Sequence, residues 1–216
     1  MLIFKPLERR KAVIDLQDLV KIDEPSKKEK ILKASLAIFS KKGFPEATMR
    51  EIAQKAGVSL GLIYFYFKNK DDILKEIFIR INSSFPKEVF EETSEADPKE
   101  ILGNLCLSHM KFLARNFKQF MMFLNESMNN NKLGEFLYTN GMEEGFRDIG
   151  EIFSRLQNKS KFRKFDTENA TSILLNSLFM FVLFKEGPFK KQLKDKSYEE
   201  YGATLTDIFI NGMLLK

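Results

Sequence analysis

A short stretch of the sequence holds side chains with the chemistry of phosphate and base recognition. Tyr64 and Tyr66 carry hydroxyl groups that can donate hydrogen bonds to phosphate oxygens. Thr48 and Lys70 can bind phosphate in the same way, and Arg50 can donate to a phosphate or to a base edge. These residue types together indicate a surface for a nucleic acid.

Two short helices must position these side chains. The sequence predicts helices at 49–56 and 59–66, for which the hydroxyl residues Thr48 and Ser59 can serve as caps. Gly57, in the turn between them, allows the left-handed backbone that folds one helix across the other. A longer helix predicted at 27–42 adds a third apolar stripe. The three helices can enclose a small core formed by Ile31, Ile38, Phe39, Ile52, Ala53, Val58, Ile63 and Phe67. This arrangement is typical of a helix-turn-helix unit, whose second helix lies in the major groove of DNA.

The same segment resembles the DNA-binding domain of the tetracycline-repressor (TetR) family. The matching residues run in register without a gap, and they are Ile31-Leu32, Ala34, Phe39, Gly43-Phe44, Ala47-Thr48, Ile52-Ala53, Ala56-Gly57-Val58-Ser59, Gly61, Ile63-Tyr64, Tyr66-Phe67 and Lys70. The rest of the chain is similar to the family only in its plan of long helices. The resemblance implies that the polar and aromatic residues of this segment contact DNA.

The predicted recognition helix, 59–66, opens with three residues that should approach the base edges. Ser59 and Leu60 come first, and Gly61 lets the backbone come close to the DNA. Leu60 and Leu62 depart from the family, which usually places at least one polar side chain here. They cannot hydrogen-bond to bases, but they can touch thymine methyl groups. Arg50 is therefore the best candidate for a hydrogen bond to a base or phosphate.

Two of these residues have a second interpretation that does not involve DNA. Thr48 can serve only as a helix cap, and Phe65 can face DNA or merely be exposed. Lysines at the start of the 27–42 helix add screened attraction to a polyanion. The predicted DNA-binding set is Lys28, Thr48, Arg50, Ser59, Leu60, Gly61, Tyr64, Phe65, Tyr66 and Lys70.

The charge of the chain is concentrated at this end. Residues 1–80 hold 17 Lys and Arg against 11 Asp and Glu, whereas residues 81–216 hold 18 against 19. This asymmetry favours a polyanionic partner for the N-terminal part alone, although a solvated lysine-rich surface would have the same composition.

The composition argues against several other classes of protein. A single cysteine, Cys106, excludes an internal disulfide framework, and a single histidine, His109, leaves no His-rich zinc site. We find no catalytic constellation and predict neither an enzyme nor a metal or cofactor site. No uncharged apolar stretch approaches the length of a membrane span, and the N-terminus lacks the apolar core of a secretory signal. We therefore expect a cytoplasmic protein without a membrane partner.

The chain is predicted to be all-α, with an N-terminal extension at 1–25, a helix-turn-helix domain at 26–72 and a larger helical domain at 73–216. The extension contains a basic cluster and a weak amphipathic segment at 8–21. It has three interpretations, which are a basic arm in the minor groove, an extra packing helix and a partly ordered tail. The remaining helices are predicted at 70–90 (with a kink or end at Pro86), 98–115, 117–128, 132–157, 167–185 and 198–215.

The resemblance implies that the larger domain binds a small ligand and forms a homodimer through helices 167–185 and 198–215. The apolar excess of helix 167–185 supports this independently, because such a helix is buried on more than one side. The predicted pocket is rich in Phe and Met and suits a small hydrophobic effector, with the candidates His109, Phe112, Phe120, Phe123, Met142, Phe146, Asn176 and Phe179. Each of these can equally be an ordinary core residue, and Asn176 can bond across the dimer instead.

Three functions are compatible with these features. The first is a dimeric repressor that a small hydrophobic ligand releases from a palindromic operator on double-stranded DNA. The second is a DNA-binding architectural or nucleoid-linked factor without an inducer. The third is an all-α enzyme or lipid carrier, which would need an apolar cavity but no basic DNA-binding surface.

Overall fold

The computed structural model of the protein describes residues 26–90, 97–158 and 162–213. The N-terminal extension, with its predicted amphipathic segment at 8–21, lies outside the described residues, so its three interpretations stay open. The described residues form helices and no strand, which confirms the all-α prediction.

Most helices begin and end within two residues of the predicted bounds. They are α1 (Lys27–Lys42), α2 (Met49–Ala56), α3 (Leu60–Tyr66), α4 (Lys70–Ser83), α5 (Pro98–Arg115), α6 (Phe117–Asn129), α7 (Asn131–Leu137), α8 (Glu143–Asn158), α9 (Thr167–Glu186) and α10 (Tyr198–Met213). A short 3-10 helix, Lys87–Phe90, follows α4. A π-helical turn, Tyr138–Met142, joins α7 to α8.

Two predicted helices are interrupted in the structure. The helix expected at 70–90 ends at Ser83, three residues before Pro86, because the residue before a proline is biased away from the helical conformation. The helix expected at 132–157 is divided by the π-helical turn, which periodicity does not reveal because the apolar spacing continues through it.

Side-chain caps fix the helix starts where the sequence predicts them. Ser26, Thr48 and Ser197 each accept a hydrogen bond from the backbone N–H of the glutamate three residues on. That glutamate in turn accepts one from the backbone N–H of the cap. Asn69 and Asp97 cap α4 and α5 with their side-chain oxygens. Each cap is worth about 1 kcal/mol, so local sequence alone sets these boundaries.

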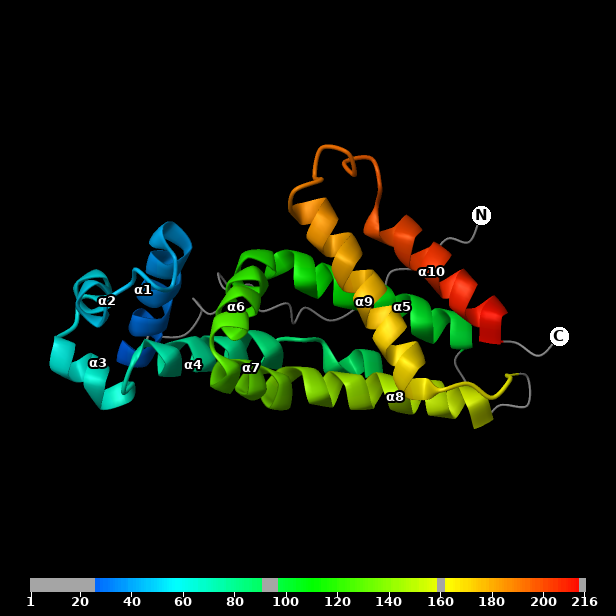
Figure 1. Ribbon diagram of the computed structural model, residues 1–216, viewed down its shortest axis with the longest axis horizontal. Helices are drawn as coiled ribbons and strands as arrows, with labels where there is room; N and C mark the ends of the chain where they lie inside the picture. The colour runs from blue at the N-terminus through cyan, green and yellow to red at the C-terminus, as the bar shows by residue number, and fades with distance from the viewer. Residues whose placement is uncertain (1–25, 91–96, 159–161, 214–216) are drawn as a thin grey trace.

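The helices form an elongated molecule with a small three-helix unit at one end (Figure 1). This unit consists of α1, α2 and α3, and α4 leads from it toward the larger set of helices. In that distal part α5 packs against both α9 and α10, and α8 packs against α9.

The buried side chains form two clusters, and the boundary between them does not fall at one point of the chain, because α5 contributes residues to both. The first cluster contains the core of the three-helix unit and continues through α4 to Phe112, Phe123, Leu133 and Leu137. The second cluster joins α5, α8, α9 and α10. Phe120 packs against both. The three-helix unit therefore shares a continuous core with α6 and α7 by way of α4.

Among the described helices, α9 alone is long and apolar enough to cross a membrane by length and composition. This is weak evidence, because the core helix of a soluble protein passes the same test. Its contacts with α5 and α8 are those of a helix packed in a bundle.

Candidate nucleic-acid interface

Six of the eight predicted core residues of the three-helix unit are buried, and the other two, Ile38 and Val58, pack half-buried against them. This core fixes the orientation of α3. Ile31, Ile52 and Ile63 are fully buried, and Phe67 closes the core just after α3. Gly57 has φ +66°, the left-handed conformation that the turn between α2 and α3 requires. Because Ile63 and Phe67 point inward, the opposite side of α3 must face outward.

The outward side of α3 consists mainly of aromatic residues. Phe65 is 79% exposed, and Tyr64 and Tyr66 are exposed beside it. The Phe65 and Tyr66 rings meet edge to face with centroids 5.2 Å apart. Exposed aromatic surface in a contiguous patch marks a binding face, because such side chains gain free energy when a partner covers them. The tyrosine hydroxyls can also donate hydrogen bonds to phosphate oxygens.

The first turn of α3 leaves the backbone accessible. Ser59 caps the helix through a hydrogen bond from the backbone N–H of Leu62. A Cβ atom at Gly61 would meet nothing within 4 Å, so no internal contact explains the glycine. Leu60 is partly buried against the core, which leaves it less able to reach base edges than the sequence suggests.

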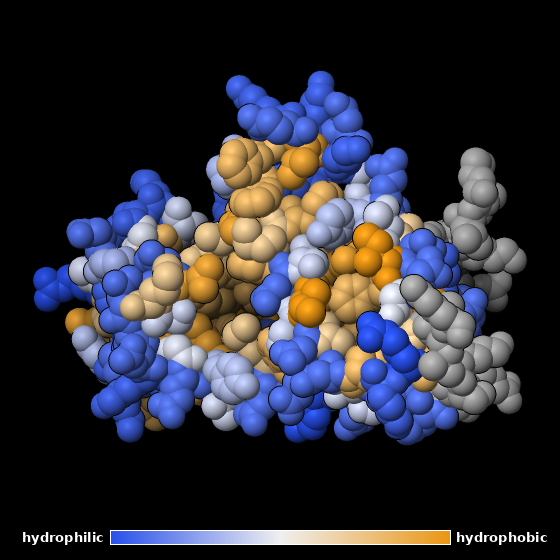
Figure 2. Space-filling model, turned by 45° about the vertical axis from the view of Figure 1, so that its right-hand side comes forward, coloured by the Kyte–Doolittle hydropathy of each residue, from blue (hydrophilic) through white to orange (hydrophobic). Residues whose placement is uncertain are grey.

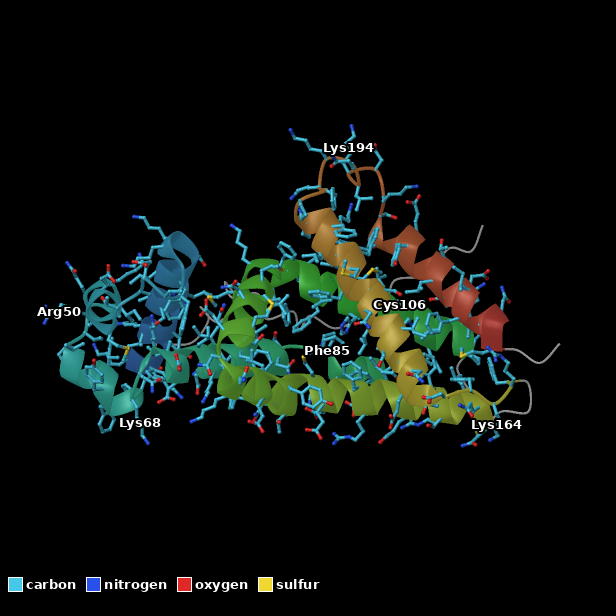
Figure 3. The ribbon with its side chains drawn as sticks, in the orientation of Figure 1. Arg50, Lys68, Phe85, Cys106, Lys164 and Lys194 are labelled. Carbon is cyan, nitrogen blue, oxygen red and sulfur yellow. The ribbon has the colours of Figure 1, made fainter. Side chains whose placement is uncertain are left out.

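Cations surround α3 without acidic partners. Arg50 on α2 and Lys68 after α3 are exposed and form no ion pair within the described residues. Figure 3 shows both side chains projecting from the α2–α3 end of the molecule. Lys68 was missed by the sequence analysis, although a lysine directly after a predicted recognition helix is the signal that could have found it.

Thr48 is the N-cap of α2, as one of its two interpretations expects. Its hydroxyl accepts from the backbone N–H of Glu51 and donates to the carboxylate of the same residue at 2.7 Å. Lys42 binds that carboxylate at 2.6 Å. The hydrogen bonds from Lys42 and Thr48 lower the pKa of Glu51 to about 2. The hydroxyl is thus engaged as a helix cap, while the exposed start of α2 remains open to a phosphate.

Two predicted DNA contacts have intramolecular partners in the structure. Lys28 pairs with Glu76 on α4 at 2.8 Å. The Lys70 ammonium donates to the carbonyls of Phe44 at 2.9 Å and Pro45 at 2.6 Å, and it lies 4.7 Å from the Phe44 ring centroid. Lys70 therefore ties the start of α4 to the turn between α1 and α2, a role the sequence did not indicate because the two segments are distant along the chain.

The structure brings together only part of the predicted ligand pocket. Phe112 lies between Phe85 and Phe120, with ring centroids 5.1 and 5.6 Å away, and Phe120 leads on to Phe123. The ring centroid of His109 lies 5.7 Å from that of Phe85. Burial lowers the pKa of His109 to about 4, so its imidazole is neutral near pH 7.

The other pocket candidates lie apart from these rings. Met142 is exposed in the π-helical turn, and Phe179 packs at the edge of the second cluster. Asn176 is exposed on the outer face of α9, which removes the need for a buried partner and argues against a place inside a pocket. Phe146 is half-buried and belongs to neither cluster.

An open surface depression of about 600 Å³ lies where α8 gives way to α9. It is lined by Ser154, Gln157, Asn158, Phe165, Asp166, Thr167 and Glu168, none of which was predicted as a ligand contact. Within the described residues no three His, Cys, Asp or Glu side chains form a group that could hold a metal ion.

Comparison with known proteins agrees with this geometry. Residues 31–77 match the family of bacterial regulatory proteins described as the tetR family. The chain is 32% identical over 123 residues to the HTH-type transcriptional regulator YerO of Bacillus subtilis (strain 168), an alignment that covers 54% of this chain and 42% of that protein. It is 35% identical over 85 residues to the fatty acid metabolism regulator protein of the same organism, covering 39% and 44%. The chain thus spans about two fifths of the length of these relatives.

The fold is similar well beyond the matched segment. FadR from Bacillus subtilis, solved in complex with stearoyl-CoA, superposes with a TM-score of 0.69 at 20% identity, covering 85% of this chain and 98% of that one. Residues 31–77 therefore carry the sequence of a tetR-family DNA-binding domain, and the described part of the chain has the fold of solved TetR-family structures.

Proposed function

We propose that this protein is a dimeric repressor that a small hydrophobic ligand releases from a palindromic operator. The observation that carries the proposal is the outer face of α3, where three consecutive aromatic side chains are exposed and Gly61 has open space beside it. Tyr64 and Tyr66 would bind phosphates, and the start of α3 would approach the bases. Arg50 and Lys68 would add phosphate contacts on either side.

Dimerisation would use the outer faces of α9 and α10. Ile173, Asn176 and Met180 recur at helical spacing on α9 and are exposed, and Ile208 on α10 is 62% exposed. Figure 2 shows apolar surface gathered where α9 lies, below the hydrophilic loop at the top of the molecule. A second copy would cover this surface, and the Asn176 amide, which both donates and accepts, could pair with its own copy across the twofold axis.

The ligand would bind between the two buried clusters. Phe85 and Phe120 contact the buried Phe112 ring and yet keep part of their own surface accessible, which supports a space beside them. A neutral imidazole among phenyl rings suits an apolar chain rather than an anion. Stearoyl-CoA is bound by FadR, which shares this fold, so long-chain acyl-CoA is the first ligand class to test.

Release would follow from the core that α4 shares with α6 and α7. A ligand that spreads these helices would move α4 and change the spacing of the two α3 helices in the dimer. The ligand must bind the DNA-incompetent state more tightly than the other state, because otherwise it shifts no equilibrium. We place this activity in the cytoplasm, where the operator DNA of a bacterial regulator lies.

Selection of bound duplexes from a random DNA pool tests the proposal. Tyr64→Ala is the test variant, and Phe189→Ala is the matched control, because Phe189 is also an exposed aromatic residue (45% against 52% for Tyr64) and lies in the loop after α9. We expect a palindromic site that Tyr64→Ala loses and Phe189→Ala keeps. Stearoyl-CoA added to that complex should release the DNA, with free coenzyme A as the control.

Other outcomes would favour the other hypotheses. Salt-sensitive DNA binding without sequence preference, in the wild type and in both variants, would favour an architectural factor. A protein that bound acyl-CoA but no duplex at all would contradict a regulator and support a carrier.

A further inference from the structure

The π-helical turn Tyr138–Met142 packs against α4, and its closest approach is at a glycine. A Cβ atom placed on Gly141 would lie 2.3 Å from Cζ and 2.7 Å from Cε1 of Phe78, the buried aromatic residue in the middle of α4. Non-bonded contacts of a Cβ atom are essentially never shorter than 3.0 Å. The ring edge of Phe78 therefore occupies the place of a side chain at position 141, and only glycine permits this approach.

Phe78 cannot easily retreat from this contact. On its other side the ring meets Phe123 of α6 edge to face, with centroids 5.2 Å apart. One turn further along α4, the side-chain amide of Asn82 donates to the backbone carbonyl of Asn140 in the same π-helical turn at 3.5 Å. A ring contact and a hydrogen bond thus hold one face of α4 against the turn.

The π-helical turn also connects the two buried clusters. A π turn adds one residue to a helical turn, which changes the direction of the residues that follow, and such turns occur frequently at functional sites. After Met142 the chain continues as α8, whose Ile149 and Phe153 belong to the second cluster and which packs against α9. A shift of α8 relative to α4 therefore bears on the contact between Gly141 and Phe78, together with the Lys87–Glu144 ion pair that joins the segment after α4 to α8.

We propose that this π-helical turn is the seat that fixes the position of α4, and that the distal helices control the DNA-binding unit by changing the fit of Phe78 on Gly141. This inference rests on the proposed function, because it assigns to one contact the coupling that ligand release requires. Gly141 and Phe78 are positioning residues, since neither lies at the DNA or ligand surface.

The test uses a matched pair of glycines in the full chain. Gly141→Ala places a methyl group against Phe78, whereas Gly145→Ala, four residues on, places one where nothing lies within 4 Å. We expect Gly141→Ala to weaken binding to the selected operator by about tenfold, within the usual range of coupling between sites. Gly145→Ala should bind as wild type does. Adding Phe78→Leu to Gly141→Ala should restore most of the affinity, because the shorter side chain vacates the clash.

A second readout does not depend on DNA. Spin labels at Lys55→Cys on α2 and Arg155→Cys on α8, with labelled chains diluted into unlabelled protein, report the distance between the two ends within one protomer. Gly141→Ala should shift or broaden this distance distribution, and Phe78→Leu should reverse the change. Should Gly141→Ala fail to fold, Phe78→Leu alone should broaden the distribution, because it leaves α4 without its seat.

The two proposals fail in different ways. Wild-type affinity and unchanged distances in Gly141→Ala would contradict the proposal that the π-helical turn fixes the position of α4. Affinity that Phe78→Leu does not restore would contradict it as well. A wild-type protein without operator preference would contradict the proposed repressor function. A distance change in Gly141→Ala would still support the proposal that the π-helical turn positions α4.

Discussion

The two ends of the molecule use aromatic side chains in opposite ways. On α3, Tyr64, Phe65 and Tyr66 project into solvent. In the distal part, Phe112 and Phe123 are buried, and their rings meet neighbouring rings edge to face. Burying apolar surface stabilises a protein by about 25 cal/mol per Å², and the exposed rings of α3 do not contribute this free energy to the fold. They are available to a partner, whereas the distal rings stabilise the fold. Binding and stability should therefore depend on separable residues.

Replacing one phenylalanine at each end of the molecule by alanine tests most directly whether operator binding and stability depend on different residues. Phe112→Ala should lower the free energy of unfolding by about 3–5 kcal/mol, because it leaves a cavity in the first cluster. Phe65→Ala should change stability by less than about 0.5 kcal/mol, as exposed substitutions do. It should nevertheless weaken operator binding by about tenfold or more, the range for a side chain that contacts bases.

Urea unfolding at one fixed protein concentration measures the first quantity, and fluorescence anisotropy with labelled operator measures the second. Equal destabilisation by the two substitutions, or full operator affinity in Phe65→Ala, would contradict a division between binding and stability.

Acid should affect the distal part before the three-helix unit. Burial lowers the pKa of His109 to about 4 from its ordinary value of 6.5. Between these values the unfolded chain binds a proton that the folded chain does not, so stability falls as pH decreases from 6.5 to 4, by about 1–3 kcal/mol. In the three-helix unit, Glu51 stays charged over this range because its pKa is about 2.

The unfolding free energy measured between pH 7 and pH 4 checks this expectation against His109→Gln. The variant should lose that share of the pH dependence. An identical slope in both proteins would show that His109 is not buried in its neutral form.

The three-helix unit could be predicted from the sequence because its signals are local. A cap at each helix start, a turn glycine with positive φ and a short apolar stripe are all readable within a few residues, and each lies where it was expected. Lys70 is the exception, since its partners at Phe44 and Pro45 depend on how α4 returns to the α1–α2 turn.

The distal part was predictable as helices but not as a packed arrangement. Apolar spacing continues through the π-helical turn, so it gave no sign that Met142 would be exposed or that Gly141 would face Phe78. Asn176 interrupts an apolar helix in the sequence, yet it lies on the outer face of α9. Which face of an apolar helix points inward depends on its neighbours, and periodicity alone does not determine that choice.

Two glycines four residues apart in the chain, Gly57 and Gly61, should respond differently to alanine. Gly57 has φ +66°, so Gly57→Ala should destabilise the protein by about 1 kcal/mol. Gly61 lies in the first turn of α3 with open space around it, so Gly61→Ala should keep or slightly raise stability through helix propensity. Only Gly61→Ala should weaken operator binding at temperatures where both variants are folded. Thermal unfolding and anisotropy together separate the two effects, and operator affinity left intact by Gly61→Ala would exclude close approach of the α3 backbone to DNA.

Lys68 and Lys70, between α3 and the start of α4, should show the smallest and most specific difference between a DNA contact and an internal contact. Lys68 is exposed and its ammonium has no acidic partner in the part of the chain that the structure describes, whereas the Lys70 ammonium is bound to backbone carbonyls. A lysine that neutralises a phosphate adds about 0.9 to the slope of log affinity against log salt. Lys68→Gln should therefore reduce this slope by about one and leave the melting temperature unchanged. Lys70→Gln should lower the melting temperature and keep the slope, because the lost interaction lies within the protein, and Lys70→Arg should restore part of the stability. A reduced salt slope in Lys70→Gln with unchanged stability would show instead that Lys70 leaves its carbonyl partners to bind phosphate when DNA is present.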